Sequence, residues 1–259
     1  MCLITLAWQA HPQHRLILAA NRDEFFERET DPVNFWKESP QVLAGRDLEA
    51  GGTWCGITRE GRFAALTNYR DAIKFGATGE RRSRGLLVAD YLQGDSSAGE
   101  YAQNTWNRRD DYAGFNLLLG DREDLYYVSN RHQRMRLGAG IHGLSNGEVN
   151  GTWPKVRKAK SGMRSLIEKK GEFDVEAAFD MMADRRESED QDLPDTGVGV
   201  ELERFLSPMF IAGQTYGTRC TSVITLDHNG DIAFFERAFN ADGVATGTVV
   251  FRNVKERVA

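Results

Sequence analysis

The chain has 259 residues, a formal net charge of -5, 41% hydrophobic residues and 27% charged residues. This composition supports a sizeable apolar core and excludes wholesale disorder. The acidic balance argues against a nucleic-acid partner, because proteins of that class carry a basic face. No run approaches the roughly 18 apolar residues that cross a bilayer, and the N-terminus lacks the features of a secretory signal. We therefore expect a cytoplasmic protein without a membrane span.

The three cysteines are Cys2, Cys55 and Cys220. They cannot all pair with one another, and none lies in the Cys-x-x-Cys spacing of a zinc site. The sequence therefore predicts reduced thiols, with neither a disulfide framework nor a bound metal. It indicates no cofactor.

The chain begins with a predicted β-hairpin. Two apolar runs, residues 2–8 and 15–20, are separated by a turn centred on residues 12–13. Cross-strand partners in this hairpin have numbers that sum to about 25, which places Cys2 opposite Asp23. A slip of one or two residues covers the whole polar tetrad, which consists of Asn21, Arg22, Asp23 and Glu24. The hairpin therefore carries the tetrad to the N-terminal cysteine.

The next segment, residues 25–40, contains prolines and several aromatic residues and predicts a long ordered loop. After it, the apolar periodicity and the turn residues predict alternating groups of strands and helices. The first group is two strands over residues 51–58 and 62–68, followed by helices over 83–93 and 98–107, the first of them capped by Ser83. The second group is strands over residues 115–119, 125–129 and 141–145, followed by helices over 153–170 and 175–185. The last group is strands over residues 218–226, 232–238 and 249–252. This order favours antiparallel sheet with helices packed outside it, in one α+β domain spanning residues 1–259. The pattern alone does not select one α+β fold.

Cys2 would carry both a thiol and a free α-amino group once Met1 is removed, which the small side chain at position 2 permits. The amine, with a reference pKa of about 7.7 to 8, would accept the thiol proton, so that no separate catalytic histidine is needed. The alternative is that Cys2 is only a small apolar residue at the start of a strand, since free cysteine is commonly buried.

The tetrad supplies charge beside Cys2. A carboxylate of the tetrad would hold the amino terminus, and Arg22 would stabilise a thiolate or a substrate carboxyl by charge-assisted hydrogen bonds. The alternative is a turn at the end of a strand with a surface salt bridge. The predicted register favours the functional interpretation.

Three further polar residues lie at the ends of apolar runs. Asn68 and Asn146 would each present a side-chain amide to a developing oxyanion, although asparagine at a strand end is also a common turn former. Arg219 enters a strongly β-like run, where it would belong to a buried ion pair or clamp an anionic substrate. Cys55 and Cys220 lie within β-like runs and are interpreted as small buried residues.

Together these motifs resemble the NRDE-motif family, also called the transport and Golgi organisation protein 2 family, over nearly the whole chain. In chain order, the motifs that carry the resemblance are Met1-Cys2, Asn21-Arg22-Asp23-Glu24, Gly51-Gly52-Thr53-Trp54, Thr67-Asn68-Tyr69-Arg70, Ser83-Arg84-Gly85, Leu144-Ser145-Asn146, Tyr216-Gly217-Thr218-Arg219-Cys220 and Phe235-Glu236-Arg237. Their combination in this order makes the resemblance specific.

The family looks related to the N-terminal nucleophile hydrolases, whose cysteine members include penicillin V acylase and bile salt hydrolase. This resemblance implies a four-layer αββα sandwich, with two stacked antiparallel sheets between layers of helices. It also implies that Cys2 is the nucleophile after loss of Met1. Asn146 would match the oxyanion-hole asparagine, Asn68 a second polar group near it, and Arg219 a late arginine near the nucleophile.

The tetrad departs from the hydrolase pattern. Hydrolases of this class usually place an arginine and an aspartate three residues apart, whereas Arg22 and Asp23 are adjacent. The residues expected to support the site or to bind substrate, without individual roles, are therefore Asn21, Arg22, Asp23, Glu24 and Tyr69.

The leading hypothesis is a cysteine N-terminal nucleophile hydrolase that cleaves a C–N bond of an acylated small molecule. Eukaryotic members of the family are tied to Golgi organisation, mitochondrial lipid metabolism and haem trafficking. The resemblance therefore also supports an alternative, a non-catalytic protein that binds and traffics haem or a lipid-like acyl ligand. Both hypotheses predict a small-molecule partner, and the sequence does not indicate an oligomeric state.

Overall fold

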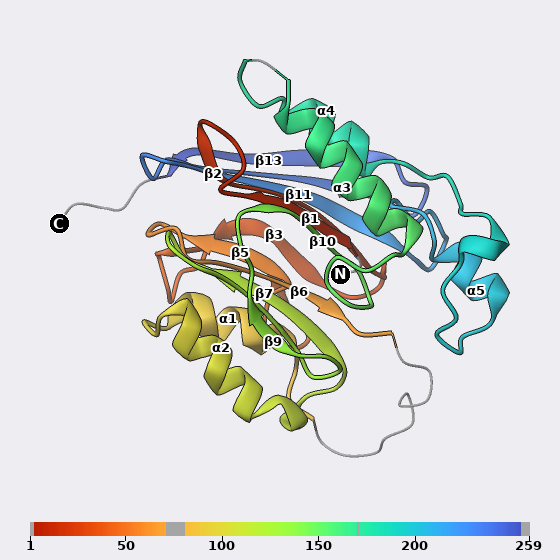
Figure 1. The fold of residues 1–259 in the computed structure, drawn as a ribbon, viewed down its shortest axis with the longest axis horizontal. Helices are drawn as coiled ribbons and strands as arrows, with labels where there is room; N and C mark the ends of the chain where they lie inside the picture. Colours follow the sequence, from red (N-terminus) through yellow and green to blue (C-terminus); the bar gives the residue numbers. More distant parts are fainter. Residues whose placement is uncertain (1–2, 71–80, 170, 255–259) are drawn as a thin grey trace.

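Two antiparallel β-sheets are stacked face to face, and a pair of helices covers the outer face of each (Figure 1). The computed structural model describes residues 3–70, 81–169 and 171–254. Buried apolar side chains form a cluster between the sheets and one cluster under each pair of helices. The expected α+β architecture with αββα layers is therefore confirmed.

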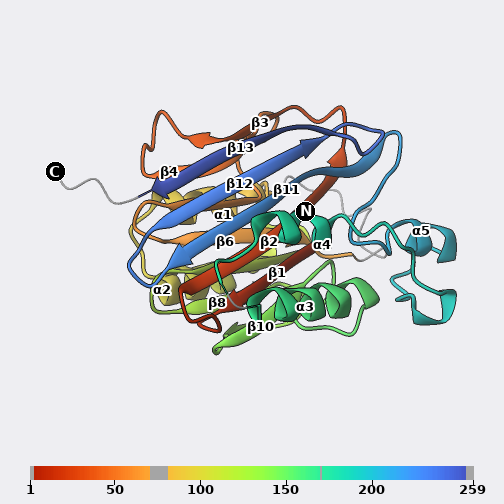
Figure 2. The same ribbon diagram turned by 90° about the horizontal axis from the view of Figure 1, so that it is seen from above.

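The first sheet, sheet A, contains the N-terminal hairpin. Its six strands have the order β10 (Gly140–Leu144), β1 (Leu3–Trp8), β2 (His14–Phe25), β11 (Tyr216–Asp227), β12 (Ile232–Phe239) and β13 (Ala245–Val254). Successive side chains of a strand point to opposite faces. Ile4 and Leu6 of β1 accordingly lie between the sheets, whereas Leu3 and Ala7 lie in the outer cluster. The helices of that outer layer are α3 (Pro154–Ile167) and α4 (Val175–Met182) (Figure 2).

The second sheet, sheet B, follows the order of the chain, since each strand pairs with the next one. Its seven strands are β3 (Thr30–Phe35), β4 (Val42–Asp47), β5 (Cys55–Thr58), β6 (Phe63–Asn68), β7 (Phe115–Gly120), β8 (Leu125–Ser129) and β9 (Arg134–Arg136). Helices α1 (Gly85–Gln93) and α2 (Ala98–Asn107) cover its outer face through an apolar cluster. The described ranges also contain short 3-10 helices, which are η2 (Arg109–Asp111) and η3 (Asp190–Asp192). None of the helices in the described ranges is long and apolar enough to span a membrane.

The register of the N-terminal hairpin places the tetrad inside a strand rather than after one. The pairs run from Leu3 with Asn21 to Trp8 with Leu16, so partner numbers sum to 24 instead of the expected 25. Strand β2 continues to Phe25 because its other edge pairs with β11 along the whole tetrad. Strand β11 therefore fixes the positions of all four tetrad residues, and β1 also pairs with Asn21.

Part of the predicted loop over residues 25–40 is sheet instead, so that prediction is wrong. Residues 30–35 form β3, the edge strand of sheet B. Pro32 is tolerated there because an edge strand has one unpaired side, and the β3–β4 pairing is interrupted between Asp31 and Asn34. The expected cap of α1 is also wrong, since Arg84 occupies the N-cap position and no side chain bonds to the first turn.

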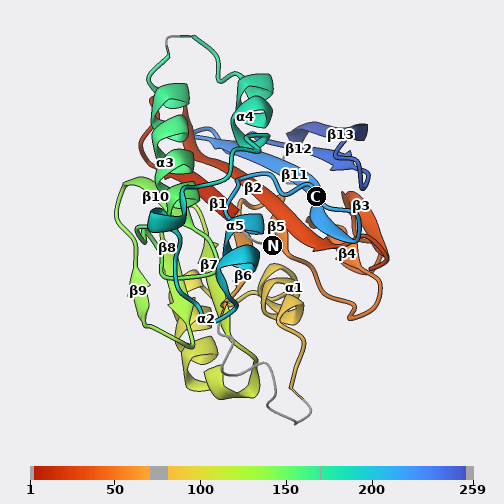
Figure 3. The ribbon, with the colours of Figure 1, turned by 90° about the vertical axis from the view of Figure 1, so that its right-hand side faces the viewer.

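A short helix that the sequence patterns do not predict, α5 (Val200–Phe205), stands at one end of the sheets. It lies in front of them when the molecule is viewed from that end (Figure 3). The buried Lys155 of α3 holds the C-terminal end of α5, because its Nζ donates to the Leu206 carbonyl oxygen at 2.7 Å.

Three histidines gather at the turn of the N-terminal hairpin. The His11 and His14 rings lie 5.1 Å apart, and His228 Nε2 lies 3.3 Å from the His11 carbonyl oxygen. His11 Nδ1 accepts hydrogen bonds from the backbone N–H groups of Gln13 and His14, each at 3.2 Å. Burial lowers the pKa of both His11 and His14, and neighbouring histidines lower it further, while Asp227 acts in the opposite direction on His14.

These lowered pKa values predict acid-sensitive stability. As the pH falls, the unfolded chain takes up protons at an ordinary histidine pKa of about 6.5, before the folded protein does. The free energy of unfolding is therefore expected to be retained above pH 6.5 and to decrease below it. Urea unfolding at pH 7.5 and pH 5.5 measures this decrease. It should be smaller in His14→Gln than in the native protein, whereas an equal decrease in the two proteins would contradict the assignment.

Candidate functional site

The start of β1 lies between two groups of polar residues in sheet A. Strand β1 pairs with β2 on one side, where Leu3 is opposite Asn21, and with β10 on the other, where Ile4 is opposite Leu144. On the β2 side, the tetrad extends beyond the level of Leu3, the first described residue of β1. On the β10 side, the chain that leaves β10 toward Asn146 extends beyond the same level. Cys2 lies outside the described residues.

The tetrad is divided between the two faces of β2. Asn21 is fully buried on the helix side, where Nδ2 donates to the carbonyl oxygens of Met182 at 2.9 Å and Met209 at 2.7 Å. Its Oδ1 accepts from the Thr221 hydroxyl at 2.6 Å. These bonds join β2 to the end of α4 and to the segment before β11, so Asn21 is an architectural residue.

Asp23 is 2% exposed and makes only part of the hydrogen bonds that a carboxylate can accept. Its Oδ1 accepts from the Thr218 hydroxyl at 2.7 Å, and that hydroxyl accepts from the Ile211 backbone N–H at 2.9 Å. The other oxygen, Oδ2, is buried and has no hydrogen-bond partner among the described residues. An unpaired buried carboxylate oxygen is costly, so this atom indicates a missing donor.

Arg22 and Glu24 are next to Asn21 and Asp23 in β2 and point to the opposite face. Arg22 is 4% exposed, and its guanidinium lies 4.3 Å from the centre of the Trp54 ring. In the described part of the chain Arg22 has this cation–π contact and no ion pair or hydrogen bond of its side chain. Half-buried Glu24 accepts from the Phe25 backbone N–H at 3.0 Å.

Both side chains line a cavity of about 290 Å³, whose wall also includes Trp54 and Asn68. The described wall contains five arginines and two carboxylates, and Arg28 pairs with one of these carboxylates, that of Asp47, at 2.9 Å. Helix α1 begins at the same wall without an acidic residue in its first turn. The cavity is therefore electropositive, because the arginines of its wall outnumber the carboxylates and the helix N-terminus adds partial positive charge.

A larger cavity, of about 720 Å³, lies around the hairpin turns that contain His14 and His228. Those turns are at the opposite ends of β1 and β11 from the tetrad. We therefore place the candidate site at the smaller cavity.

Asn68 and Asn146 come together although Asn68 ends a strand of sheet B and Asn146 follows a strand of sheet A. Asn146 is 4% exposed, and its Nδ2 donates to the Asn68 carbonyl oxygen at 2.8 Å. The chain on both sides of Asn146 is fixed by Asn116, whose Nδ2 donates to the carbonyl oxygens of Ser145 at 3.3 Å and Gly147 at 3.0 Å. Sequence reasoning missed Asn116, although an asparagine inside the apolar run of residues 115–119 is the kind of signal that indicates a buried polar network.

Arg219 makes main-chain hydrogen bonds and no ion pair within the described residues, and its role as a clamp for an anionic substrate stays a prediction. Its Nη1 donates to the carbonyl oxygens of Phe25 at 2.8 Å and Arg28 at 2.9 Å, and it lies 5.5 Å from the Phe26 ring. Burial lowers the pKa of Arg219, and the charge of Arg22 lowers it further. Arg219 therefore fixes the turn that follows the tetrad and adds positive charge near Arg22.

Comparison with known proteins places the chain in a family. The family model described as "Transport and Golgi organisation 2" matches residues 1–241. The chain belongs to this family. A bovine relative, "Transport and Golgi organization protein 2 homolog" of Bos taurus, is 32% identical over 92% of the chain and 93% of its own length. The homolog of Mus musculus is 30% identical over the same shares.

A solved structure has the same arrangement of layers as this Transport and Golgi organisation 2 family member. The C2A mutant of the conjugated bile acid hydrolase from Clostridium perfringens aligns with a TM-score of 0.52 over 99% of the chain and 94% of that protein. The sequence identity is 11%, so the likeness concerns the fold. The fold is that of the N-terminal nucleophile hydrolases.

The other cysteines of this family member lie inside the core. Cys55 and Cys220 are free and buried, and burial raises the pKa of both thiols. Cys220 Sγ lies 3.5 Å from Glu236, whose own pKa burial raises and whose Oε1 accepts from the Val33 backbone N–H at 2.9 Å. Both thiols therefore stay protonated at neutral pH and are poor nucleophiles, as their interpretation as small buried residues predicts.

Tyr69, the last of the predicted site residues, lies beside His132. The two rings are 5.3 Å apart, and the Tyr69 hydroxyl lies 3.2 Å from His132 Nε2. The backbone N–H of Tyr69 donates to Gly114 at 3.0 Å, directly after the end of β6. These contacts fix the chain that follows Asn68.

Proposed function

We propose that this protein is a cysteine N-terminal nucleophile hydrolase that cleaves the C–N bond of an acylated small molecule, with Cys2 as the nucleophile. The observation that carries the proposal is the unpaired Oδ2 of buried Asp23. Cys2 is bonded to Leu3, whose partner in β2 is Asn21, so a free α-amino group would begin within reach of this carboxylate. A trimmed N-terminus would supply the donor that Asp23 lacks.

The proposed reaction assigns the proton to the α-amine of Cys2. The amine takes the proton of the thiol, and the thiolate adds to the amide carbonyl to give a tetrahedral oxyanion. The C–N bond then breaks, the amine returns the proton to the leaving nitrogen, and a thioester remains on Cys2. Water hydrolyses the thioester, releasing the acid and restoring the thiol. An N–H of Asn146 is the proposed donor to the oxyanion.

The electropositive cavity supports a substrate that carries an anionic group near its acyl bond. Arg22 is buried there with its guanidinium held on Trp54 and without a carboxylate partner in the described chain. A planar guanidinium in a site shielded from water binds carboxylate or phosphate oxygens through two parallel hydrogen bonds. We therefore propose that Arg22 binds substrate rather than the thiol.

The test combines mass spectrometry with thiol labelling. We expect the intact mass of the purified protein to show loss of Met1, and a thiol probe on the native protein to label Cys2 well before Cys55 and Cys220. Hydrolysis of an acylated substrate should fall by about 10³-fold or more in Cys2→Ala. Retention of Met1, equal labelling of the three thiols or full hydrolysis in Cys2→Ala would each contradict the proposal.

The alternative, a non-catalytic carrier of haem or an acyl ligand, makes a different prediction for the same variant. A carrier would bind its ligand equally well in the native protein and in Cys2→Ala, with no turnover in either. Titration of both proteins with haem and with a long-chain acyl compound, followed by product analysis, separates the two functions.

A further inference from the structure

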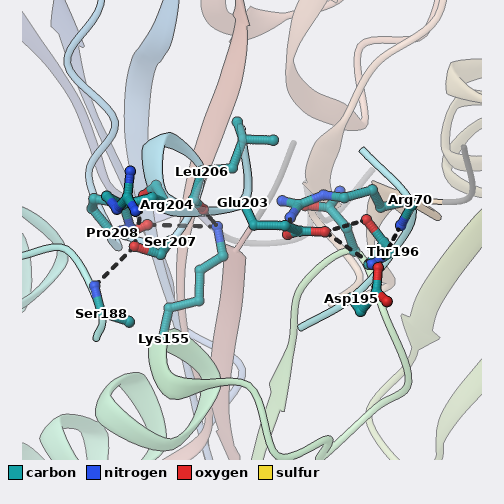
Figure 4. Close-up of polar contacts among 12 residues, drawn as sticks. Arg70, Lys155, Ser188, Asp195, Thr196, Glu203, Arg204, Leu206, Ser207 and Pro208 are labelled. Atoms are coloured by element: carbon teal, nitrogen blue, oxygen red, sulfur yellow. Dashed lines mark hydrogen bonds and ion pairs between the residues drawn. The ribbon is translucent and has the colours of Figure 1, made fainter. Parts of the chain in front are cut away.

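A buried ion pair links the site to α5. Arg70, which follows β6, contacts Glu203 of α5 with 2.6 Å between Nη1 and Oε2, and the two side chains are only 8% and 3% exposed. Glu203 Oε1 accepts from both the backbone N–H and the hydroxyl of Thr196 (Figure 4). Both oxygens of the buried carboxylate are therefore used, which is the condition for tolerating such a charge away from water.

The same arginine contacts Asn146. Arg70 Nη2 lies 3.4 Å from Asn146 Oδ1, and the Arg70 backbone N–H donates to the Asn146 carbonyl oxygen at 2.8 Å. The guanidinium also lies 5.0 Å from the centre of the Trp153 ring. Glu203, Trp153 and the Asn146 amide thus all contact Arg70, and the cation contacts the oxygen of the amide.

These contacts set the direction of the Asn146 amide. The oxygen end accepts from Arg70, and the nitrogen end donates to the Asn68 carbonyl oxygen at 2.8 Å. Rotating the amide by half a turn would bring its NH₂ group against the guanidinium and its oxygen against a carbonyl oxygen, two repulsive contacts. In the present orientation one N–H of Nδ2 has no other partner among the described residues, so it is available to an oxyanion.

We propose that Glu203 is a positioning residue, which acts through Arg70 to hold the Asn146 amide with its N–H edge directed for oxyanion binding. This inference rests on the proposed function. A purely structural ion pair would stabilise α5 without altering the chemistry at Cys2. A positioning residue changes the reactions that form an oxyanion and leaves other reactions of the thiol unaltered.

The experiment compares two reagents that modify the same thiol. Iodoacetamide alkylates Cys2 by direct displacement of iodide and forms no oxyanion. A β-lactone is attacked at its carbonyl, passes through an oxyanion, and opens at its C–O bond to leave a thioester on Cys2 and a hydroxyl on the reagent. The ratio of the β-lactone rate to the iodoacetamide rate, measured on full-length protein, therefore reports oxyanion stabilisation alone.

In Glu203→Gln the ratio is expected to fall by about tenfold or more, and in Asn146→Ala by about 10²-fold, the usual effect of removing one oxyanion donor. Arg204→Gln breaks an exposed ion pair of the same helix, with Asp190 at 2.8 Å, and is expected to leave the ratio unchanged. If Glu203→Gln does not fold, Arg70→Lys replaces it, because lysine keeps a positive charge beside Glu203 but loses the second N–H contact with Asn146.

An unchanged ratio in a folded Glu203→Gln variant, or in its Arg70→Lys replacement, would overturn the positioning role while the proposed function stands. Failure of the β-lactone to acylate Cys2 in the native protein would instead overturn the proposed function, and this inference with it. The two failures are therefore distinguishable.

Discussion

Replacing Asn21 with alanine is expected to lower the free energy of unfolding by about 3–4 kcal/mol, although Asn21 opens the tetrad that suggested a reaction. Its amide makes three buried hydrogen bonds, to the carbonyl oxygens of Met182 and Met209 and from the Thr221 hydroxyl. The variant leaves all three groups without their partner, and a buried polar group that loses its partner costs about 1–3 kcal/mol. Urea unfolding at neutral pH measures the change.

Asn107→Ala is the matched control, because the Asn107 side chain is exposed at the end of α2 and accepts one bond from Gln103. Its expected effect is within about 0.5 kcal/mol. Thiol labelling of Cys2 should continue in Asn21→Ala under conditions where the variant remains folded. A stable Asn21→Ala protein whose Cys2 had lost its reactivity would show that Asn21 belongs to the reaction and not to the framework.

Gly52→Ala is the second substitution with a large expected effect. A Cβ at position 52 would lie 2.4 Å from the carbonyl carbon of Gly85 and 2.8 Å from the backbone nitrogen of Leu86. These are backbone atoms of α1, so the helix itself must move. We expect a loss of about 2–4 kcal/mol in the free energy of unfolding, at or above the upper end of overpacking effects. Urea unfolding provides the measurement.

Gly51→Ala distinguishes the steric contact at position 52 from the backbone strain that alanine has at a positive φ. Gly51 has φ +71° and no atom within 4 Å of its would-be Cβ, so its cost is the conformational one of about 1–2 kcal/mol. Gly52→Ala should therefore be the more destabilising of the two neighbours. The reverse order would mean that α1 does not pack against this segment as closely as described.

Most of the fold could be predicted from the sequence, because apolar patterns and turn residues are local signals. The hairpin around residues 12–13, the helix over residues 98–107 and the helix predicted over residues 175–185, which ends at residue 182, required no information about distant contacts. Strand β3 was missed for a physical reason, since Pro32 opposes central sheet and only the edge position makes it acceptable. Helix α5 has six residues, too few to show a period, and depends on tertiary contacts such as the Arg70–Glu203 pair.

The candidate site was predictable in location and not in roles. Counting along the hairpin placed the tetrad within one residue of its observed register, because strand pairing follows from the turn. The register of the hairpin alone could not assign separate roles to Asn21 and Arg22. Their partners come from α4, from Trp54, and from β11 and the segment before it. Arg219 shows the same limit, because its acceptors are main-chain oxygens that no sequence pattern displays.

The division of the tetrad between two faces of β2 also limits which insertions and deletions the gene can tolerate. An extra residue in the turn around residues 9–13 would be absorbed by the loop, because pairing with β1 and β11 holds β2 on both edges. A single codon gained or lost just before Asn21 would exchange the faces, carrying Arg22 beneath α4 and Asn21 into the cavity. Length changes in this protein should therefore accumulate at the hairpin tips and be absent from the central part of β2.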